Sequence, residues 1–372
     1  MRFRTSCVVL VGALVGATLV SAQAPRARNV VLVTLDGARW QEIFTGLNEQ
    51  LLRATTAKET DITTLPVYKQ FSGPGPRERR ERLMPFLWGT FVVDHGFIAG
   101  NRTVGSLVSV TNRHWVSYPG YSEILTGQAH DAEIKSNDAI RNPFPSVFQF
   151  VQRRLMLQPA QIATFASWGV FNEIVESERG ATTINAGHVA YESPSPQIQA
   201  LSALQRETPT AWSNARRDAY TFHFAMDYVK RVHPRVLYIA FDETDDWAHD
   251  GHYDLVLEML HRTDAYLKEL WDTLQADPQY RGTTTLIVTT DHGRGRTVDD
   301  WKRHGKEVAG ADEIWVAIAS PDGARRGEWR DHPPLFQNQI AATIAAAFGL
   351  KYSEQNPQAG QAIALKESIR PY

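Results

Sequence analysis

The amino-acid sequence predicts an α/β protein with a largely parallel central sheet that helices flank on both faces. Near-continuous runs of apolar and β-branched residues recur along the chain, as expected of strands that are covered on both faces. Segments with apolar residues at three- and four-residue spacing alternate with these runs, which is the order typical of a parallel sheet. Asp and His residues follow several of the runs directly. Together these observations predict both the fold and a polar site at one edge of its sheet.

The individual elements follow from these patterns. We expect strands at residues 29–35, 161–166, 235–241, 283–290 and 313–319. We expect helices at residues 253–275 and 333–348, the second with Asp331 as a possible cap and Gly349 after its end. Residues 44–105 are rich in Arg, Pro and Gly and are predicted to form an insertion or cap. We therefore expect residues 25–372 to form one elaborated α/β domain.

The first 24 residues have the pattern of an export signal. Arg2 and Arg4 precede an apolar run at residues 7–20, and Ala22-Gln23-Ala24 has the small-x-small form of a cleavage site. The run is shorter than the ~20 residues that a spanning helix needs, so cleavage is favoured over a membrane anchor. We expect an exported protein, periplasmic or secreted. Its single cysteine, Cys7, would be removed, so a metal site must use His, Asp and Glu.

Composition excludes two broad classes of protein. The 372 residues are 43% hydrophobic, and 39 Lys and Arg stand against 41 Asp and Glu. The near-neutral charge argues against a dedicated nucleic-acid binder, which has a basic surplus. The plentiful apolar residues argue against disorder. No stretch after the signal is apolar enough to span a membrane. We expect the partner to be a small-molecule substrate.

Acidic and histidine residues at the predicted strand ends indicate a metal site. Asp36 follows the first strand, Asp291 and His292 follow the fourth, and Asp245 and His249 lie just beyond the third. Ligands of open α/β sheets bind at the carboxyl ends of the strands. Carboxylates gathered there raise one another's pKa unless cations are bound. Asp and His without Cys suit Zn²⁺, or Mn²⁺ if oxygen ligands predominate.

Ser117 is a candidate nucleophile ahead of a predicted helix. A serine hydroxyl needs a base or a metal to attack at neutral pH. Gly120-Tyr121-Ser122 lacks the second glycine of a nucleophile elbow, and the sequence contains neither a P-loop nor a His-Glu-x-x-His motif. Activation of Ser117 by a metal is therefore favoured.

These residues resemble the alkaline phosphatase superfamily, most closely its type I phosphodiesterase/nucleotide pyrophosphatase branch, from about residue 29 to about residue 350. The resemblance implies a sheet between helices and two divalent ions, zinc in that family, beside a Thr or Ser nucleophile. It implies that Ser117 is the nucleophile. It further implies one metal site at Asp36, Asp291 and His292, and a second at Asp245, His249 and His304.

Three assignments within this resemblance have alternatives. Asp242 is a rival to Asp245, but the residue four positions after it is not histidine. His332 is the runner-up to His304 as the distant ligand. Asn137 lies at about the position of a family asparagine whose amide donates to a substrate oxygen, and a simple turn role is equally consistent with its place in the sequence.

Two departures from the family pattern affect the expected substrate. Sulfatases of this superfamily carry Cys/Ser-x-Pro-x-Arg, and Tyr121 stands here in place of that arginine. An unmodified Ser117 nucleophile is therefore favoured over an oxidised one. The nucleotide-hydrolysing members carry Thr-Phe-Pro-Asn-His, whereas this chain has Ser-Tyr-Pro-Gly-Tyr from Ser117. That change weakens the case for a nucleotide substrate.

The expected function is metal-dependent hydrolysis of a phosphate ester through a covalent phosphoserine. A monoesterase needs a cation for the additional phosphate charge, and the candidates near the motifs are Arg39, Arg113, Lys135 and Arg141. A diesterase would offer an aromatic pocket instead, and we slightly favour this class for the nearby Trp40, Trp115, Tyr118, Tyr121 and Trp247. The alternatives are a sulfatase-like hydrolase, a phosphoglycerate-mutase-like phosphotransferase and a non-catalytic binding protein of the same fold.

Overall fold

The computed structural model describes residues 27–365 except 211 and 213, so the predicted export signal lies outside the described residues. Eight strands form the main sheet in the order β5-β4-β6-β1-β7-β8-β2-β9, and two more form a small second sheet, β10-β3. Their bounds are β1 Asn29–Leu35, β2 Gly96–Ala99, β3 Val108–Ser109, β4 Ile162–Ala166, β5 Thr183–Ala186, β6 Val236–Phe241, β7 Thr284–Thr289, β8 Val316–Ala319, β9 Gly327–Glu328 and β10 Leu335–Phe336.

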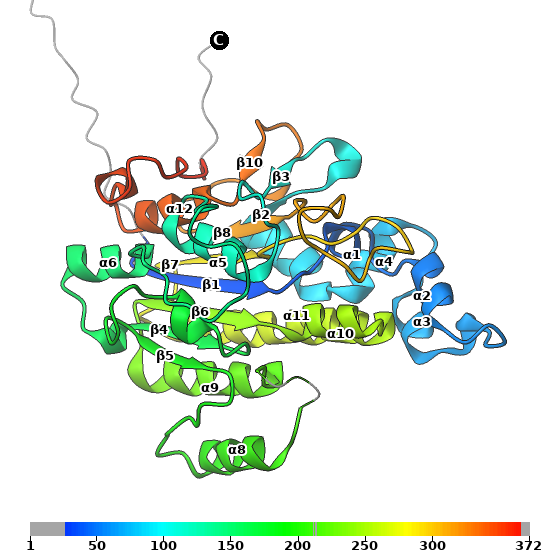
Figure 1. The fold of residues 1–372 in the computed structure, drawn as a ribbon, viewed down its shortest axis with the longest axis horizontal. Coiled ribbons are helices and arrows are strands. Elements are labelled where there is room, and N and C mark those ends of the chain that lie inside the picture. The colour runs from blue at the N-terminus through cyan, green and yellow to red at the C-terminus, as the bar shows by residue number, and fades with distance from the viewer. Residues whose placement is uncertain (1–26, 211, 213, 366–372) are drawn as a thin grey trace, which may run out of the picture.

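The helices alternate with these strands along the chain (Figure 1). Their bounds are α1 Trp40–Thr45, α2 Glu49–Thr55, α3 Pro66–Phe71, α4 Pro76–Leu83, α5 Ser117–Thr126, α6 Val147–Leu155, α7 Phe171–Ile174, α8 Pro196–Glu207, α9 Asp218–Val232, α10 Glu243–Asp250, α11 Tyr253–Ala276 and α12 Gln339–Ala347. A π-helical turn, η2, spans Leu87–His95. No helix among the described residues is long and apolar enough to cross a membrane.

The predicted α/β class is confirmed. Strands β5, β4, β6, β1 and β7 run parallel to one another, and β8 pairs antiparallel with both β7 and β2. Every residue of β1 is buried, because helices cover both faces of the sheet. This double burial explains why the sequence of β1 reads as a continuous apolar run rather than an alternation.

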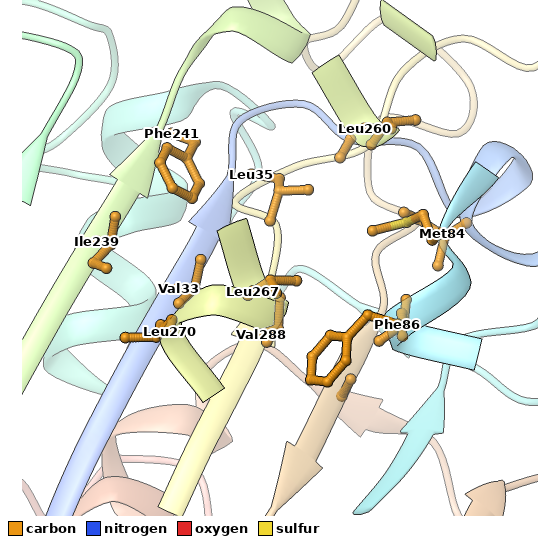
Figure 2. Close-up of a cluster of buried hydrophobic side chains, with 14 of the residues drawn as sticks. Val33, Leu35, Met84, Phe86, Ile239, Phe241, Leu260, Leu267, Leu270 and Val288 are labelled. Carbon is orange, nitrogen blue, oxygen red and sulfur yellow. The ribbon is translucent and has the colours of Figure 1, made fainter. Parts of the chain in front are cut away.

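Alternate residues of β1 contribute to two separate cores. Val33 and Leu35 pack with residues of α11 and with Met84 and Phe86 on one face, as Figure 2 shows. Val30 and Leu32 point to the other face, where α5, α6 and α12 supply the apolar side chains. The period-two alternation of a strand therefore places a helical layer on each side of the sheet.

One predicted helix begins later than expected. The segment predicted as a helix from residue 333 first forms β10, in which Leu335 N donates to Leu107 O at 3.0 Å and Gln337 N donates to Ser109 O at 2.9 Å. Pro333 and Pro334 have no N–H groups and disfavour helical geometry in the residue before each of them. Helix α12 therefore starts at Gln339, after Asn338, and Asp331 does not cap it.

The segment predicted as an insertion or cap, residues 44–105, contains α2, α3, α4, η2 and β2. Its apolar residues join the core on the α11 side of the sheet. Strand β2 pairs with β8, which links this segment to the main sheet. Asp264 of α11 also holds this segment in place, because its carboxylate accepts hydrogen bonds from Phe86 N at 2.7 Å and Leu87 N at 2.8 Å.

Candidate metal centre and nucleophile

The three central strands end together at one edge of the sheet. Strand β1 lies between β6 and β7, with Leu35 opposite Phe241 and Thr34 opposite Thr289. The residues that follow these strands therefore emerge side by side. Gly37 N donates a hydrogen bond to Asp291 Oδ1 at 3.1 Å, which ties the turn after β1 to the turn after β7. The register of the sheet is what brings these distant parts of the sequence together.

Four of the predicted site residues converge at this edge. His292 Nε2 lies 3.5 Å from Asp36 Oδ1 and 3.4 Å from Asp291 Oδ2. The same nitrogen lies 3.3 Å from Ser117 Oγ. All four residues are buried, and the side chains come from three different elements of the fold. We call this group the first cluster.

The remaining three predicted ligands form a second cluster, Asp245, His249 and His304. His249 Nε2 lies 3.1 Å from Asp245 Oδ2 and 3.0 Å from His304 Nε2. Asp245 and His249 are four residues apart on α10, so they share one face of that helix. The two clusters adjoin, because the rings of His292 and His304 stack with centroids 3.9 Å apart.

The donor atoms of both clusters suit divalent cations. Asp36 Oδ1 and Asp291 Oδ2 are buried without a hydrogen-bond partner among the described residues. His292 Nδ1 lies 2.9 Å from Gly293 O, and His304 Nδ1 lies 3.2 Å from Trp115 O. A carbonyl oxygen can only accept, so Nδ1 carries the proton in both rings and the Nε2 lone pairs face the clusters. These are the nitrogen and oxygen donors that Zn²⁺ and Mn²⁺ accept.

The electrostatics of the clusters also favour bound cations. Burial, followed by repulsion from Asp291 and Asp245, raises the pKa of Asp36 well above its ordinary value. Burial lowers the pKa of His292 well below its ordinary value and that of His304 to about 4. The imidazoles are therefore neutral and ready to bind a metal at neutral pH. A divalent cation would relieve the repulsion between the carboxylates.

Arg294 is a buried cation beside the second cluster that sequence reasoning missed. Its guanidinium forms an ion pair with the carboxylate of Asp245, and its Nη2 donates to Asp245 O at 3.0 Å. Burial raises the pKa of Asp245, but Arg294, His249 and His304 together outweigh burial and hold that pKa well below its ordinary value. Its position directly after Asp291-His292-Gly293 was the only signal available in the sequence.

Ser117 is held at the first turn of α5 by a relay of polar contacts. Glu123, which is fully buried, accepts from Thr111 N at 2.9 Å and from Asn112 N at 2.8 Å. Asn112 Oδ1 in turn accepts from Trp115 N at 3.0 Å. Trp115 has a φ of 51°, an uncommon value for a non-glycine residue, and α5 begins two residues later. The relay stabilises this turn and thereby the position of the hydroxyl.

Asn137 lies beside Ser117, at the position that the sequence predicted for a substrate-binding amide. Its Oδ1 accepts from Tyr118 N at 2.9 Å, which fixes the orientation of the amide. Its Nδ2 donates to none of the described residues. Asn137 and Ser117 line the same cavity. The hydrogen bond to Tyr118 is the turn-stabilising role, and the remaining Nδ2 hydrogens are available to a ligand.

A cavity of about 350 Å³ opens in front of the clusters. Trp168 and Trp212 supply its aromatic surface, and neither was singled out from the sequence. Trp212 packs edge-on against Trp247, with ring centroids 4.8 Å apart. The full lining is Ser117, Asn137, Trp168, Trp212, Asn214, Ala215, Asp242, Asp245, Asp246 and His249. A larger cavity of about 630 Å³ lies between residues 126–133 and 355–358 and contains none of the predicted site residues.

The cations near the sequence motifs are either paired with carboxylates or exposed. Arg39 pairs with Glu42 in the core, and Arg141 pairs with Glu173 at 2.8 Å. The side chain of Arg113 is 87% exposed, and Lys135 is exposed. None of the four is among the residues that line the cavity.

Two of the tyrosines named from the sequence are buried rather than exposed to a ligand. Tyr121 is 0% exposed, and its hydroxyl donates to Asp36 Oδ2 at 2.8 Å. Tyr118 is 2% exposed, and its hydroxyl donates to Ile140 O at 2.6 Å. The expectation that they line an aromatic pocket is therefore wrong, because both side chains project from α5 into the core.

The alternative ligands take other positions. Ser106 Oγ and His332 Nε2 lie 2.7 Å apart, near the small second sheet, and His332 joins neither cluster. Asp242 is buried next to Asp245 and lines the cavity. Burial raises the pKa of Asp242 well above its ordinary value, and repulsion from Asp246, Asp218 and Asp245 raises it further. The geometry thus groups His304, rather than His332, with Asp245 and His249.

Comparison with known proteins finds a family match over part of the chain. Residues 179–337 match the family model described as type I phosphodiesterase / nucleotide pyrophosphatase. This stretch contains Asp245, His249, Asp291, His292 and His304, whereas Asp36 and Ser117 precede it. No curated protein matches the sequence.

Solved structures share the fold at low sequence identity. A variant of the alkaline phosphatase PafA has a TM-score of 0.54 and 10% identity, with 92% of this chain and 99% of that chain covered. A protein in the alkaline phosphatase superfamily from Vibrio parahaemolyticus has a TM-score of 0.51 and 13% identity, with 91% and 70% covered. Murine ectonucleotide pyrophosphatase / phosphodiesterase 5, in an inactive form with AMP, has a TM-score of 0.50 and 11% identity, with 87% and 96% covered. The shared fold is that of alkaline-phosphatase-like proteins, and the family match over residues 179–337 supports the resemblance to that superfamily noted from the sequence.

Proposed function

We propose that this protein hydrolyses phosphodiesters, with Ser117 as the nucleophile beside two divalent metal ions. The observation that carries the proposal is the convergence of Ser117 Oγ with the metal-binding atoms of Asp36, Asp291 and His292, next to a second cluster of Asp and His. Cations bound there would lower the pKa of the Ser117 hydroxyl and stabilise charge on the attacking and leaving oxygens. The all-His and Asp donor set supports zinc, with manganese as the alternative.

The chain's own residues would act in two steps. Ser117 Oγ forms a bond to phosphorus as the bond from phosphorus to the leaving alcohol breaks, which leaves a phosphodiester between Ser117 and the second alcohol of the substrate. Water then attacks the phosphorus and releases the second product with the serine restored. Asn137 Nδ2, held by the hydrogen bond from Tyr118 N to its own Oδ1, would donate to a phosphoryl oxygen in both steps.

The lining of the cavity favours a diester over a monoester. A monoester carries an additional phosphate charge, which normally requires a nearby Lys or Arg. No Lys or Arg is among the residues that line the cavity, whereas Trp168 and Trp212 are. Indole rings offer apolar area to the second ester group of a diester.

An exported location is proposed on the amino-terminal sequence alone.

The test compares three nitrophenyl substrates on the zinc-loaded protein. We expect hydrolysis of bis-nitrophenyl phosphate to exceed that of nitrophenyl phosphate and nitrophenyl sulfate. Ser117→Ala should lower turnover by about a thousandfold or more, because the nucleophile is lost. Wild-type protein acid-quenched during hydrolysis of bis-nitrophenyl phosphate should carry a nitrophenyl phosphoryl group on Ser117, detected by mass spectrometry of the peptide.

Ser122→Ala is the matched control, because Ser122 is a buried serine on the same helix whose Oγ accepts from Asn142 at 3.2 Å. It should retain activity within a few-fold. A Ser117→Ala variant that is as active as the control would refute the nucleophile. Preferential hydrolysis of the sulfate ester would instead identify a sulfatase-like enzyme.

A further inference from the structure

Tyr121 places a buried hydroxyl against one of the predicted metal ligands. It lies on α5, one turn after Ser117, and its hydroxyl donates to Asp36 Oδ2 at 2.8 Å. The two residues are 85 positions apart in the sequence. The contact therefore links the helix that carries the nucleophile to the turn that follows the central strand β1.

The ring of Tyr121 is held in place and cannot reach a substrate. It is 0% exposed and packs against Phe171 with ring centroids 4.6 Å apart. It is not among the residues that line the cavity in front of Ser117. A residue in this position can act on a reaction only through the groups that it contacts.

The two carboxylate oxygens of Asp36 have different surroundings. Oδ2 accepts the hydrogen bond from Tyr121, whereas Oδ1 has no partner among the described residues and lies 3.5 Å from His292 Nε2. The backbone of Asp36 is held as well, because Thr244 Oγ1 donates to Asp36 O at 2.5 Å. The carboxylate is therefore fixed with one free oxygen facing the first cluster.

We propose that Tyr121 is a positioning residue for the first metal ion, and that its hydroxyl makes Asp36 a ligand through one oxygen only. The inference rests on the proposed function for its consequence in catalysis, but not for its effect on metal binding. Hydrogen bonds to the second oxygen of a ligand orient it, and their loss weakens metal affinity by about 10- to 100-fold.

The test is Tyr121→Phe, which removes the hydroxyl alone. Zinc affinity is measured on metal-free protein by competition with a chromogenic chelator. We expect one of the two sites to weaken by about 10- to 100-fold and the other to keep its affinity. The Co²⁺-loaded variant should show an altered visible absorption for one site, because Asp36 is then free to bind through both oxygens. Activity at limiting zinc should fall, and raised zinc should restore it with KM unchanged.

Tyr280→Phe is the matched control. Tyr280 is equally buried, but its hydroxyl donates to Pro234 O at 2.9 Å, in the loop before β6 at the opposite end of the strands. This variant reports the general effect of deleting a buried hydroxyl and should leave zinc affinity unchanged. Equal losses of affinity in the two variants would overturn the proposal, since the effect would then be one of stability.

The remaining outcomes separate this inference from the proposed function. Unchanged zinc affinity and cobalt spectrum in Tyr121→Phe, with KM raised at saturating metal, would overturn the positioning role. If wild-type protein binds two zinc ions and Tyr121→Phe weakens one, but no ester is hydrolysed, the proposed function fails and the positioning role stands. If wild-type protein binds no zinc, the positioning role fails on the same titration.

Discussion

At the scale of single residues, the site depends on imidazoles that stay neutral because they are buried. His304 sits between the second cluster and Trp115 O, and burial lowers its pKa to about 4. An ordinary histidine in the unfolded chain has a pKa of about 6.5. Between about pH 6.5 and pH 4, His304 is therefore protonated in the unfolded state but stays neutral in the folded state. His304 stabilises the fold above this window, and that contribution is lost as the pH falls through it.

The lowered pKa of His304 predicts how the stability of the metal-free protein changes in acid. Replacing His304 with Asn should flatten the fall in unfolding free energy between pH 7 and pH 4, by up to about 3 kcal/mol. Urea unfolding of metal-free wild type and variant across this range measures the difference. His223→Asn, at an exposed position on α9, is the control and should leave the profile unchanged. Parallel profiles for His304→Asn and wild type would contradict a buried, neutral His304.

Single residues of the site could be predicted from the sequence, but their contacts with one another could not. Asp36, Asp291 and His292 could be named in advance, because each follows an apolar run and strand ends meet at one sheet edge. Tyr121 could not be assigned to Asp36, nor Arg294 to Asp245, because neither contact leaves a local pattern. Such pairings depend on how distant elements pack.

At the scale of elements, the site requires α5 to lie close against the end of β7. Gly120 allows this approach, because a Cβ atom at this position would lie 2.5 Å from Asp291 O. The family pattern noted from the sequence has an asparagine here, and the structure explains why this chain has a glycine. Ser117 and Tyr121 are on the same helix, so a shift of α5 would move both groups away from Asp36, Asp291 and His292.

Gly120→Ala should therefore push α5 outward. We expect activity to fall at least about tenfold, because small misplacements of reacting groups are costly. We expect the free energy of unfolding to fall by about 1–3 kcal/mol, the usual effect of overpacking. Gly89→Ala is the control, since a Cβ at Gly89 in η2 meets nothing within 4 Å. Activity and stability in Gly120→Ala equal to those in the control would contradict the close approach of α5.

Element prediction succeeded where burial imposes a pattern. Strand β1 has the predicted bounds, and β4, β6 and β7 differ from them only at their ends. Strand β8 begins at Val316 rather than at residue 313, because Ile314 N donates to Val108 O next to the small second sheet. Strand β2 was not predicted, since Gly96–Ala99 is short and follows directly from η2.

At the scale of the whole molecule, the order of the strands decides which motifs meet. Strand β1 lies between β6 and β7, which come more than 190 residues later in the chain. The sequence predicts a parallel sheet but not this order, so the adjacency of the two clusters was available only through the family resemblance. The aromatic lining of the cavity depends on the same assembly, because Trp168 follows β4 and Trp212 lies between α8 and α9.

We propose that each of the two clusters holds one divalent metal ion, beside Ser117. Anomalous scattering at the zinc edge from crystals of the zinc-loaded protein tests it most directly. We predict two peaks, one bounded by Asp36, Asp291, His292 and Ser117, and the other by Asp245, His249 and His304. A single peak, or peaks bound to other residues, would contradict the account.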